Sequence, residues 1–353
     1  MPDRIQAGVL GATGMVGQRF VQLLHAHPWF EITALAASER STGKRYREAC
    51  RWLVSAEPPA AVRDLTVLPL KPDIDCQIVF SALPGEVAGE IEAAFAAAGY
   101  PVFSNARTYR MAPDVPLLIP EVNPEHIEII PQQRRDREWK GFIVTNPNCS
   151  AVVLTMVLKP LYDRFGLTRV SVTTFQALSG AGYPGVPSLE ALDNVIPYIG
   201  GEEEKLEIEP PKMLGRLEDG QFLNADFSVS AQCNRVAVRD GHFEAISVEL
   251  DKEVEPDEVI GAFADFSSLP QELGLPSAPK RPLVVRSEPD RPQSYLDRDV
   301  GAGMSVVIGR VRRCPVLDYK FVALGHNTIR GAAGGSVLNA ELLHKLGYLN
   351  SSS

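Results

Sequence analysis

The sequence lacks any uninterrupted apolar stretch of the about 20 residues that a membrane-spanning helix needs, so no transmembrane segment is expected. Met1 is followed by Pro2, Asp3 and Arg4, which lead directly into a strand-like run, and we expect no secretory signal. Basic residues are also too few to balance the acidic ones: 35 Lys and Arg against 44 Asp and Glu give a formal net charge of -9. Broad capture of nucleic acid or of an anionic membrane needs a concentrated basic surface, so neither partner is expected.

Cysteine is scarce and dispersed, and no two of the five cysteines form a CxxC pair. This pattern indicates free thiols in a reducing compartment, and we expect a cytoplasmic protein. The six histidines show no HxxxH spacing, and none lies close in sequence to a cysteine. A bound metal ion is therefore not expected.

The rest of the composition is that of an ordinary globular protein, with 45% hydrophobic and 22% charged residues. A chain of 353 residues exceeds the size at which one hydrophobic core usually stops growing, so two domains are expected.

The first 150 residues alternate short apolar runs with helical periodicity. A β-type run at 4–10 is followed by a glycine-rich turn and by a helix-like segment at 18–27. Strands alternating with helices predict parallel βαβ units, hence an α/β fold whose first domain is a Rossmann-type doubly wound parallel sheet. Its further expected elements are strands at 31–38, 76–83 and 100–106 and an alanine-rich helix at 86–99.

After Cys149 the strands become alternating and β-branched, at 168–178, 227–238 and 242–250. Such strands predict an α+β domain with a mixed or antiparallel sheet that has one open face. The glycine-, proline- and acid-rich segment 179–226 is too long for an inert hairpin, and we expect it to be functional or interfacial. We place the domains at 1–148 and 149–325, with a closing helical segment at 326–353 that packs back on the first domain.

Three glycines form a GxxGxxG pattern between the first strand and its helix. Glycine at such positions lets the turn close, lets backbone N–H groups approach a pyrophosphate, and lets helix and strand pack closely. The alternative is a glycine-rich turn that merely starts a helix. We favour nucleotide binding, with candidate contacts at Gly11, Thr13, Gly14, Met15, Val16 and Gly17.

The second strand is followed by "ASERSTGKR". The residues that suit an adenosine 2'-phosphate, and therefore NADP, are Ser38, Arg40, Ser41 and Lys44. Glu39 keeps NAD open as an alternative, because it could serve as the acid that binds the ribose. A solvated charged loop is the other alternative.

Cys149 follows Asn-Pro-Asn and precedes an apolar run without glycine. Asn148 is a plausible helix start, which would place the sulfur near the positive end of a helix dipole and favour a thiolate. A nucleophile also needs a partner base, and His242 stands at the start of a strand. Taken alone, His242 is more typical of a structural histidine.

Several longer motifs extend over nearly the whole chain, and together they resemble the aspartate-semialdehyde dehydrogenase family in its archaeal and fungal branch. These motifs are "GVLGATGMVGQRF", "SNARTYRMAPDVPLLIPEVN", "NPNCSA", "FQALSGAGYPG", "GGEEEK", "RVAVRDGH" and "HNTIRGAAGGSVLNAELL".

The resemblance implies a role for each matching residue. Cys149 would be the nucleophile, His242 its acid/base partner, and Gln176 an orienting residue beside the thioester. Arg235 would bind the substrate α-carboxylate through its planar fork. Glu202 would bind the α-ammonium, although Glu203 and Glu204 are adjacent candidates and a solvated turn is the alternative. The remaining expected contacts are Lys205, Arg110 and Asn148 for phosphate, and Asn327, Gly331 to Gly335 and Ser81 to Gly85 along the cofactor.

The resemblance further implies an enzyme that reversibly converts L-aspartyl 4-phosphate to L-aspartate 4-semialdehyde with NADPH, through a thioester on the cysteine. This step belongs to lysine, threonine and methionine biosynthesis. The family forms homodimers or homotetramers through the second domain, so 149–325 would be a catalytic and dimerisation domain.

Several alternatives share parts of this pattern. A malonyl-CoA reductase of the same branch would lack the Asn-Pro-Asn-Cys run and the "EEEK" segment, and "GGEEEK" also argues against N-acetyl-glutamyl-phosphate reductase. A redox-sensing NADP-binding module would keep the glycines and lose the catalytic residues. A thiol hydrolase would have no use for the nucleotide site.

Overall fold

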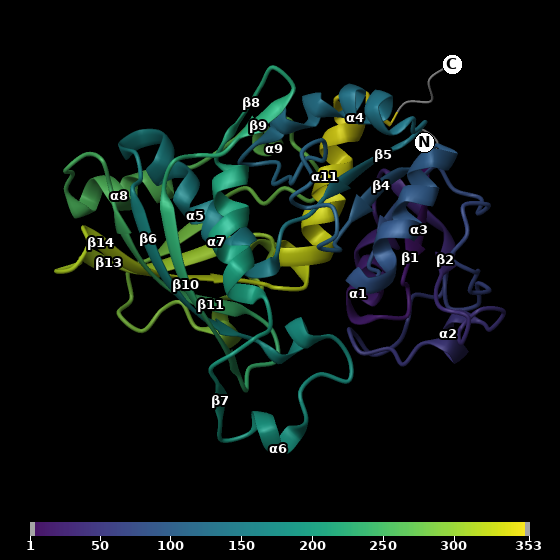
Figure 1. Cartoon of the computed structure of the whole chain (residues 1–353). Helices are drawn as coiled ribbons and strands as arrows, with labels where there is room; N and C mark the ends of the chain where they lie inside the picture. The colour runs from purple at the N-terminus through teal and green to yellow at the C-terminus, as the bar shows by residue number, and fades with distance from the viewer. Residues whose placement is uncertain (1–3, 350–353) are drawn as a thin grey trace.

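The structure, a computed structural model, describes residues 4–349, so residues 1–3 and 350–353 of the predicted first domain lie outside it. Two sheets with their helices form two units that face each other (Figure 1). No helix within this described range is long and apolar enough to cross a membrane.

The first unit is built on a five-stranded sheet in which every neighbouring pair is parallel. Its strands are almost entirely apolar and buried, as expected when helices cover both faces of a parallel sheet. In spatial order they are β2 (Phe30–Ala36), β1 (Ile5–Leu10), β3 (Ile78–Ser81), β4 (Pro101–Ser104) and β5 (Phe142–Thr145).

A single parallel bridge between Ala36 and Leu68 adds to the free edge of β2. If the segment at Leu68 is counted as a sixth, very short strand beside β2, the strand order of the sheet matches that of the dinucleotide-binding fold. The strand order reverses between β1 and β3, which is where a doubly wound sheet binds its ligand.

The helices of the first unit are α1 (Met15–Leu24), α2 (Tyr46–Ala49), α3 (Gly85–Ala98), the 3-10 helix η1 (Pro124–Ile129) and α4 (Ile130–Arg137). A later helix, α11 (Gly334–Lys345), returns to this unit beside α1 and the sheet (Figure 1). Its Val337, Leu338 and Leu342 are buried in one core cluster with Phe20, Phe80 and Phe103.

The second unit contains a seven-stranded mixed sheet. Its strands in spatial order are β12 (Leu283–Arg286), β13 (Val306–Arg313), β14 (Tyr319–Gly325), β11 (His242–Glu249), β6 (Arg169–Gln176), β10 (Ser228–Val236) and β7 (Val195–Ile196). The pairs β12–β13 and β6–β10 are parallel, and the others are antiparallel.

Three helices cover one face of this sheet: α5 (Cys149–Phe165), α7 (Glu202–Met213) and α8 (Pro256–Ala264). Residues of β6 and β11 alternate strictly, with Val172 and Ile246 in this core. On the other face, Phe175 and Phe243 pair with ring centroids 6.0 Å apart and remain partly exposed. The alternation therefore produces the open face that the sequence predicted.

The remaining elements connect these layers. They are η2 (Leu178–Ala181), α6 (Ser188–Ala191), the hairpin β8 (Arg216–Glu218) and β9 (Gln221–Leu223), α9 (Leu269–Glu272), α10 (Ser294–Asp297), η3 (Val300–Gly303) and the π-helical turn η4 (Ile329–Ala333). In Figure 1, α6 lies at the bottom, next to β7, the short edge strand of the second sheet.

The predicted fold class is confirmed: a parallel Rossmann-type sheet is joined to a unit with a mixed sheet. The segment 179–226 holds more regular structure than its glycines and prolines suggest. Its acidic stretch begins α7, which continues through Pro210 and Pro211 in its last turn.

Candidate active site

The start of α5 fixes Cys149. Asn148 is the N-cap, and its side-chain oxygen accepts from the backbone N–H groups of Ser150 and Ala151 at 3.0 and 3.2 Å. These bonds satisfy two of the free donors at the helix start. Cys149 is therefore the first helical residue and lies at the positive end of the helix dipole, as expected from the sequence.

Cys149 and His242 meet although 93 positions separate them: the sulfur lies 3.2 Å from Nε2 of the imidazole. His242 is the first residue of β11, and its Nδ1 accepts from the backbone N–H of Ala177 at 3.0 Å. Because Nδ1 is an acceptor, the neutral ring carries its proton on Nε2. His242 thus presents an N–H to the sulfur.

Both members of this pair are held neutral in the free protein. Burial raises the pKa of the Cys149 thiol to about 12, and Glu202 adds to the rise. Burial and then Arg235 lower the pKa of His242 to about 3. The charged imidazolium would also carry a proton on Nδ1, and this proton would point at the N–H of Ala177, which disfavours the charged form. This geometry therefore keeps His242 neutral at neutral pH, with its pKa far below the usual value for histidine.

Glu202, the first residue of α7, lies at the centre of a polar network. Its carboxylate accepts from Nδ2 of Asn148 at 2.8 Å and from Nζ of Lys205 at 2.6 Å. Nε2 of Gln176 lies 3.4 Å away, while Oε1 of Gln176 is buried without a partner. Burial alone would raise the pKa of Glu202, but Lys205 and Asn148 outweigh it and hold the pKa below its usual value.

Arg235 reaches the same space from β10. Its Nη1 donates to the carbonyl oxygen of Ala177 at 2.7 Å. A Cβ on Gly180 would lie 2.9 Å from this nitrogen and 3.1 Å from Cε1 of His242. Glycine at position 180 thus leaves room for both side chains to reach the space beside Cys149.

Arg110 enters from the first unit. Its Nη1 donates to Glu209 at 3.0 Å, and its Nη2 donates to the carbonyl oxygen of Asn105 at 2.8 Å. Its Nε is buried without a partner. A buried guanidinium with a free N–H is suited to bind an anion.

One cavity of about 680 Å³ joins these residues to the glycine-rich turn. The predicted residues that line it are Met15, Val16, Arg110, Asn148, Cys149, Gln176, Glu202, Lys205, Arg235 and Asn327. His242 lies directly behind the sulfur. Helix α1 and the turn η4, which lie near opposite ends of the sequence, therefore both contribute to the cavity that contains Cys149.

The three glycines of the turn have different environments. Gly11 has φ +76°, and a Cβ there would lie 2.7 Å from the carbonyl oxygen of Ala82. A Cβ on Gly17 would collide with the carbonyl oxygen of Gly11. A Cβ on Gly14 would meet no atom closer than 3.5 Å, so that position is not tightly packed. Gly11 and Gly17 thus allow close packing, and Gly14 leaves room beside the helix start.

A second cavity, of about 300 Å³, brings together Thr13, Arg40, Ser41 and Lys44. Arg51 and Tyr183 also line it, and Nη1 of Arg51 donates to the hydroxyl of Tyr183 at 2.7 Å. Three cations around one small cavity suit a phosphate group. Sequence reasoning missed Arg51 and Tyr183 because both lie outside the 37–45 motif, and Tyr183 belongs to the second unit.

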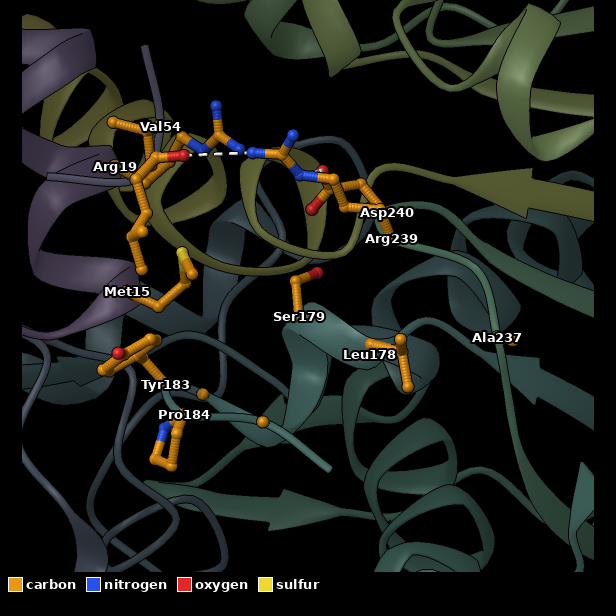
Figure 2. A pocket seen from close by; sticks show the side chains of 13 residues that line it. Met15, Arg19, Val54, Leu178, Ser179, Tyr183, Pro184, Ala237, Arg239 and Asp240 are labelled. Atoms are coloured by element: carbon orange, nitrogen blue, oxygen red, sulfur yellow. Dashed lines mark hydrogen bonds and ion pairs between the residues drawn. The ribbon is translucent and has the colours of Figure 1, made fainter. Parts of the chain in front are cut away.

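Figure 2 shows a third cavity, of about 320 Å³, at the junction of the two units. Met15, Arg19 and Val54 lie on one side, and Leu178, Ser179, Arg239 and Asp240 lie on the other. Nη2 of Arg239 donates to the carbonyl oxygen of Leu53 at 3.0 Å. Met15 also lines the active-site cavity and Tyr183 the cationic one, so the three spaces are neighbours.

The π-helical turn η4 packs against the cysteine. A Cβ on Gly331 would lie 2.7 Å from Cβ of Cys149. The side chain of Arg330 makes two 2.7 Å bonds to Glu121, and both residues are fully buried. Asn327 donates to Ser179 at 2.8 Å and accepts from the N–H of Gly241 at 2.9 Å. Such π-helical insertions are frequent at functional sites.

Four further candidate side chains line neither the active-site cavity nor the cationic one. Ser81 is buried and donates to Glu92 at 2.6 Å, while its neighbours 82–86 line the active-site cavity. Ser38 is exposed, and its carbonyl oxygen closes the 38–41 turn. Glu203 accepts from the N–H of Cys233 at 3.0 Å and Glu204 is exposed, so of the three adjacent acids Glu202 alone lines the cavity.

Comparisons with known proteins agree with this architecture. The family model "Semialdehyde dehydrogenase, NAD binding domain" matches residues 6–130, and "Semialdehyde dehydrogenase, dimerisation domain" matches residues 158–330. The aspartate-semialdehyde dehydrogenase of Archaeoglobus fulgidus is 56% identical over 97% of this chain and 98% of its own length. That of Cryptococcus neoformans is 48% identical over 98% of each chain.

The crystal structure of the Candida albicans aspartate-semialdehyde dehydrogenase with NADP superposes with a TM-score of 0.90. It is 44% identical and covers 97% of this chain and 99% of that one. The fold and the two matching domains define a semialdehyde dehydrogenase, an enzyme class that pairs a nucleotide-binding domain with a dimerisation domain. Within that class, the chain belongs to the aspartate-semialdehyde dehydrogenase family, and the resemblance found in the sequence is confirmed.

Proposed function

We propose that this enzyme catalyses the reversible, NADP-dependent reductive dephosphorylation of L-aspartyl 4-phosphate to L-aspartate 4-semialdehyde, in lysine, threonine and methionine biosynthesis. The observation that carries this proposal is the joining of Cys149, its partner His242 and an anion-binding group, Arg110, to the nucleotide-type turn around one cavity. The names of the relatives support the same substrate.

The residues present fit NADP. Gly14 leaves open space at the start of α1, where a pyrophosphate binds in this fold. Arg40, Ser41 and Lys44 line the small cationic cavity that suits the 2'-phosphate, whereas Glu39 does not line it. Bound there, NADPH supplies the hydride of the reaction.

Cys149 would carry the acyl group. In the biosynthetic direction Cys149 would first lose its thiol proton to solvent. The thiolate would then displace phosphate from the acyl phosphate, and the thioester would form on Sγ. In the reverse direction the same atom adds to the aldehyde carbon. The helix dipole and the N–H at Nε2 of His242 stabilise the sulfur as a thiolate at the moment of attack.

His242 would act as a hydrogen-bond donor in its neutral form, in place of the acid/base role that the resemblance implies. With Nδ1 occupied by the N–H of Ala177, its Nε2–H would donate a hydrogen bond first to the thiolate and then to the oxyanion on the former thioester carbon, and the ring would keep its proton throughout. Gln176 has a buried amide oxygen without a partner beside this position, which supports its orienting role.

The charges around the cavity fit an α-amino acid with a phosphate. Arg235 would bind the α-carboxylate, and Glu202 would bind the α-ammonium group. Arg110, Lys205 and the amide of Asn148 would bind the phosphate. Glu202 also argues against a malonyl-CoA substrate, which has no amino group, and the complete set of reactive residues argues against a sensor.

The test is a spectrophotometric assay of the purified protein with aspartate semialdehyde, NADP and phosphate, beside malonyl-CoA with NADPH. We expect turnover of the semialdehyde alone. Cys149→Ala should reduce turnover by at least about 10³-fold while NADP binding, measured by fluorescence titration, stays near wild type. Activity with malonyl-CoA alone, or a rate near normal in the variant, would refute the proposal.

We also infer the domain boundaries and the setting of the enzyme. The return of α11 to the core of the parallel sheet supports a cofactor domain of 1–148 completed by 326–353, with 149–325 as the catalytic and dimerisation domain. The five cysteines are free thiols, which supports a cytoplasmic location. The open face of the mixed sheet supports a homodimer or homotetramer, which light scattering would distinguish.

A further inference from the structure

Glu209 lies between the phosphate-binding and cysteine-bearing parts of the site, although no motif in the sequence draws attention to it. Its side chain is 2% exposed. One carboxylate oxygen accepts from Nη1 of Arg110 at 3.0 Å, and the other accepts from the backbone N–H of Asn148 at 2.6 Å. Glu209 therefore joins the guanidinium to the residue that precedes Cys149.

The position of Glu209 follows from helical spacing in α7. Residues 202, 205, 209 and 212 recur at intervals of three and four, so they share one face of the helix. Glu202 accepts from the side-chain amide of Asn148, and Lys212 donates to three backbone carbonyl oxygens at 110, 112 and 115. This face of α7 therefore holds both the Arg110 segment and the Asn148 turn.

The bonds of Arg110 leave a defined set of donors for a ligand. Nη1 of Arg110 donates one hydrogen bond to Glu209, and Nη2 donates one to the carbonyl oxygen of Asn105. Nε is buried without a partner. The carboxylate thus fixes the plane of the guanidinium, and the plane decides where its free N–H groups point. Glu209 itself does not line the cavity.

We propose that Glu209 is a positioning residue for the phosphate step. Its two oxygens hold Arg110 and the backbone N–H of Asn148 at a fixed separation, so that a phosphate bound by Arg110 lies in line with the sulfur of Cys149. The role rests on the proposed function for its substrate, and it assigns no contact between Glu209 and the substrate.

The first test is Glu209→Gln, which keeps the size of the side chain. A glutamine has one acceptor oxygen, and its NH2 group would face either the Arg110 guanidinium or the Asn148 N–H, both of which are donors. One of the two bonds is therefore lost. We expect the KM for phosphate in aldehyde oxidation to rise about tenfold, with the KM for NADP within about twofold of wild type.

A second measurement needs no turnover. Inorganic phosphate should protect Cys149 against alkylation by iodoacetamide, and the concentration for half protection should rise about tenfold in Glu209→Gln. If the enzyme failed to oxidise aspartate semialdehyde, the proposed function would fail, but this measurement would still report on Glu209. If the variant proved insoluble, Glu209→Asp, which is too short to reach both partners, would be measured in the same way.

The matched control is Glu207→Gln. Glu207 belongs to the same helix and accepts from the backbone N–H of Ala231 at 3.2 Å, but it is exposed and faces away from Arg110. It should leave the KM for phosphate and the protection curve unchanged. Unchanged phosphate values in Glu209→Gln, or a rise in the KM for phosphate matched by an equal rise for NADP, would overturn the inference.

Discussion

Cys149 and His242 show how a neutral pair can still present a reactive sulfur. Burial raises the pKa of the thiol to about 12 and lowers that of the imidazole to about 3. Below its pKa, the thiolate fraction grows tenfold per pH unit. The charge on the free enzyme's sulfur is therefore set by pH over the whole neutral range.

From this we predict the pH dependence of alkylation. The rate of iodoacetamide reaction at Cys149, followed by mass spectrometry of its peptide, should rise steadily from pH 6 to pH 9. No step should occur near pH 6.5, because His242 does not titrate there. A plateau above pH 7, as an ion pair of thiolate and imidazolium would give, would contradict the predicted protonation states. Cys149→Ser provides the background rate.

Glu244 is the second residue whose environment makes a measurable difference. It is fully buried on β11, two residues from His242, and neither oxygen has a hydrogen-bond partner. Burial raises the pKa of its carboxyl well above the usual value. The folded state therefore retains a proton that the unfolded chain releases, so stability is highest below the unfolded-state pKa and falls as the pH rises toward the folded-state pKa.

Glu244→Gln should remove this penalty, because glutamine is neutral at every pH. Urea unfolding should show that Glu244→Gln is more stable than wild type at pH 8, because folded wild type retains a proton there that its unfolded chain releases. The gain should shrink toward zero at pH 5. The exposed Glu253→Gln is the control, and an equal gain at both pH values would show that Glu244 is not held protonated.

At the scale of elements, the turn between β1 and α1 offers a paired test. Gly17→Ala places a methyl group against the carbonyl oxygen of Gly11, so it should destabilise the fold by about 2 kcal/mol or more. Gly14→Ala finds open space and a compatible φ of -77°, so its melting temperature should match wild type. Its methyl group should nevertheless weaken NADP binding by about tenfold, measured by fluorescence titration. Normal NADP binding in Gly14→Ala would place the pyrophosphate elsewhere.

The elements that the sequence predicted best were those with strong periodicity. The strands predicted by range, from 4–10 to 242–250, lie at nearly their observed bounds, because each periodicity allows few alternatives. Strands β5, β12, β13 and β14 were not predicted. Helix α7 was not predicted, because its three consecutive glutamates also suit a solvated turn and Pro210 and Pro211 argue against a helix. Its packing against the Asn148 turn, which is a tertiary effect, decides the outcome.

The residues of the site also divide into those that the sequence could predict and those that it could not. Residues within motifs, such as Cys149 and Arg40, could be proposed from local sequence or resemblance. Glu209, Arg51 and Tyr183 could not, because their importance comes from partners 61 to 132 positions away. The N–H of Ala177, which sets the proton on His242, belongs to the backbone and has no side-chain signature.

At the scale of the molecule, the open face of the mixed sheet predicts a self-association surface. Ala245 lies on this face of β11, beside the partly exposed Phe175 and Phe243. Ala245→Arg should lower the mass measured by light scattering, because an unpaired charge in an interface is costly. The exposed Glu90→Arg on α3 is the control. An unchanged mass for Ala245→Arg would move the interface to another surface.

The path of the chain through the molecule has a consequence for its synthesis. The core of the parallel sheet includes Phe20 near the N-terminus and Leu342 near the other end of the chain. A ribosome that has produced the first 150 residues has therefore supplied five strands of that sheet but not the helix that seals it. The apolar surface reserved for α11 stays uncovered until nearly the entire polypeptide has emerged, which makes the nascent first unit a natural client for chaperones.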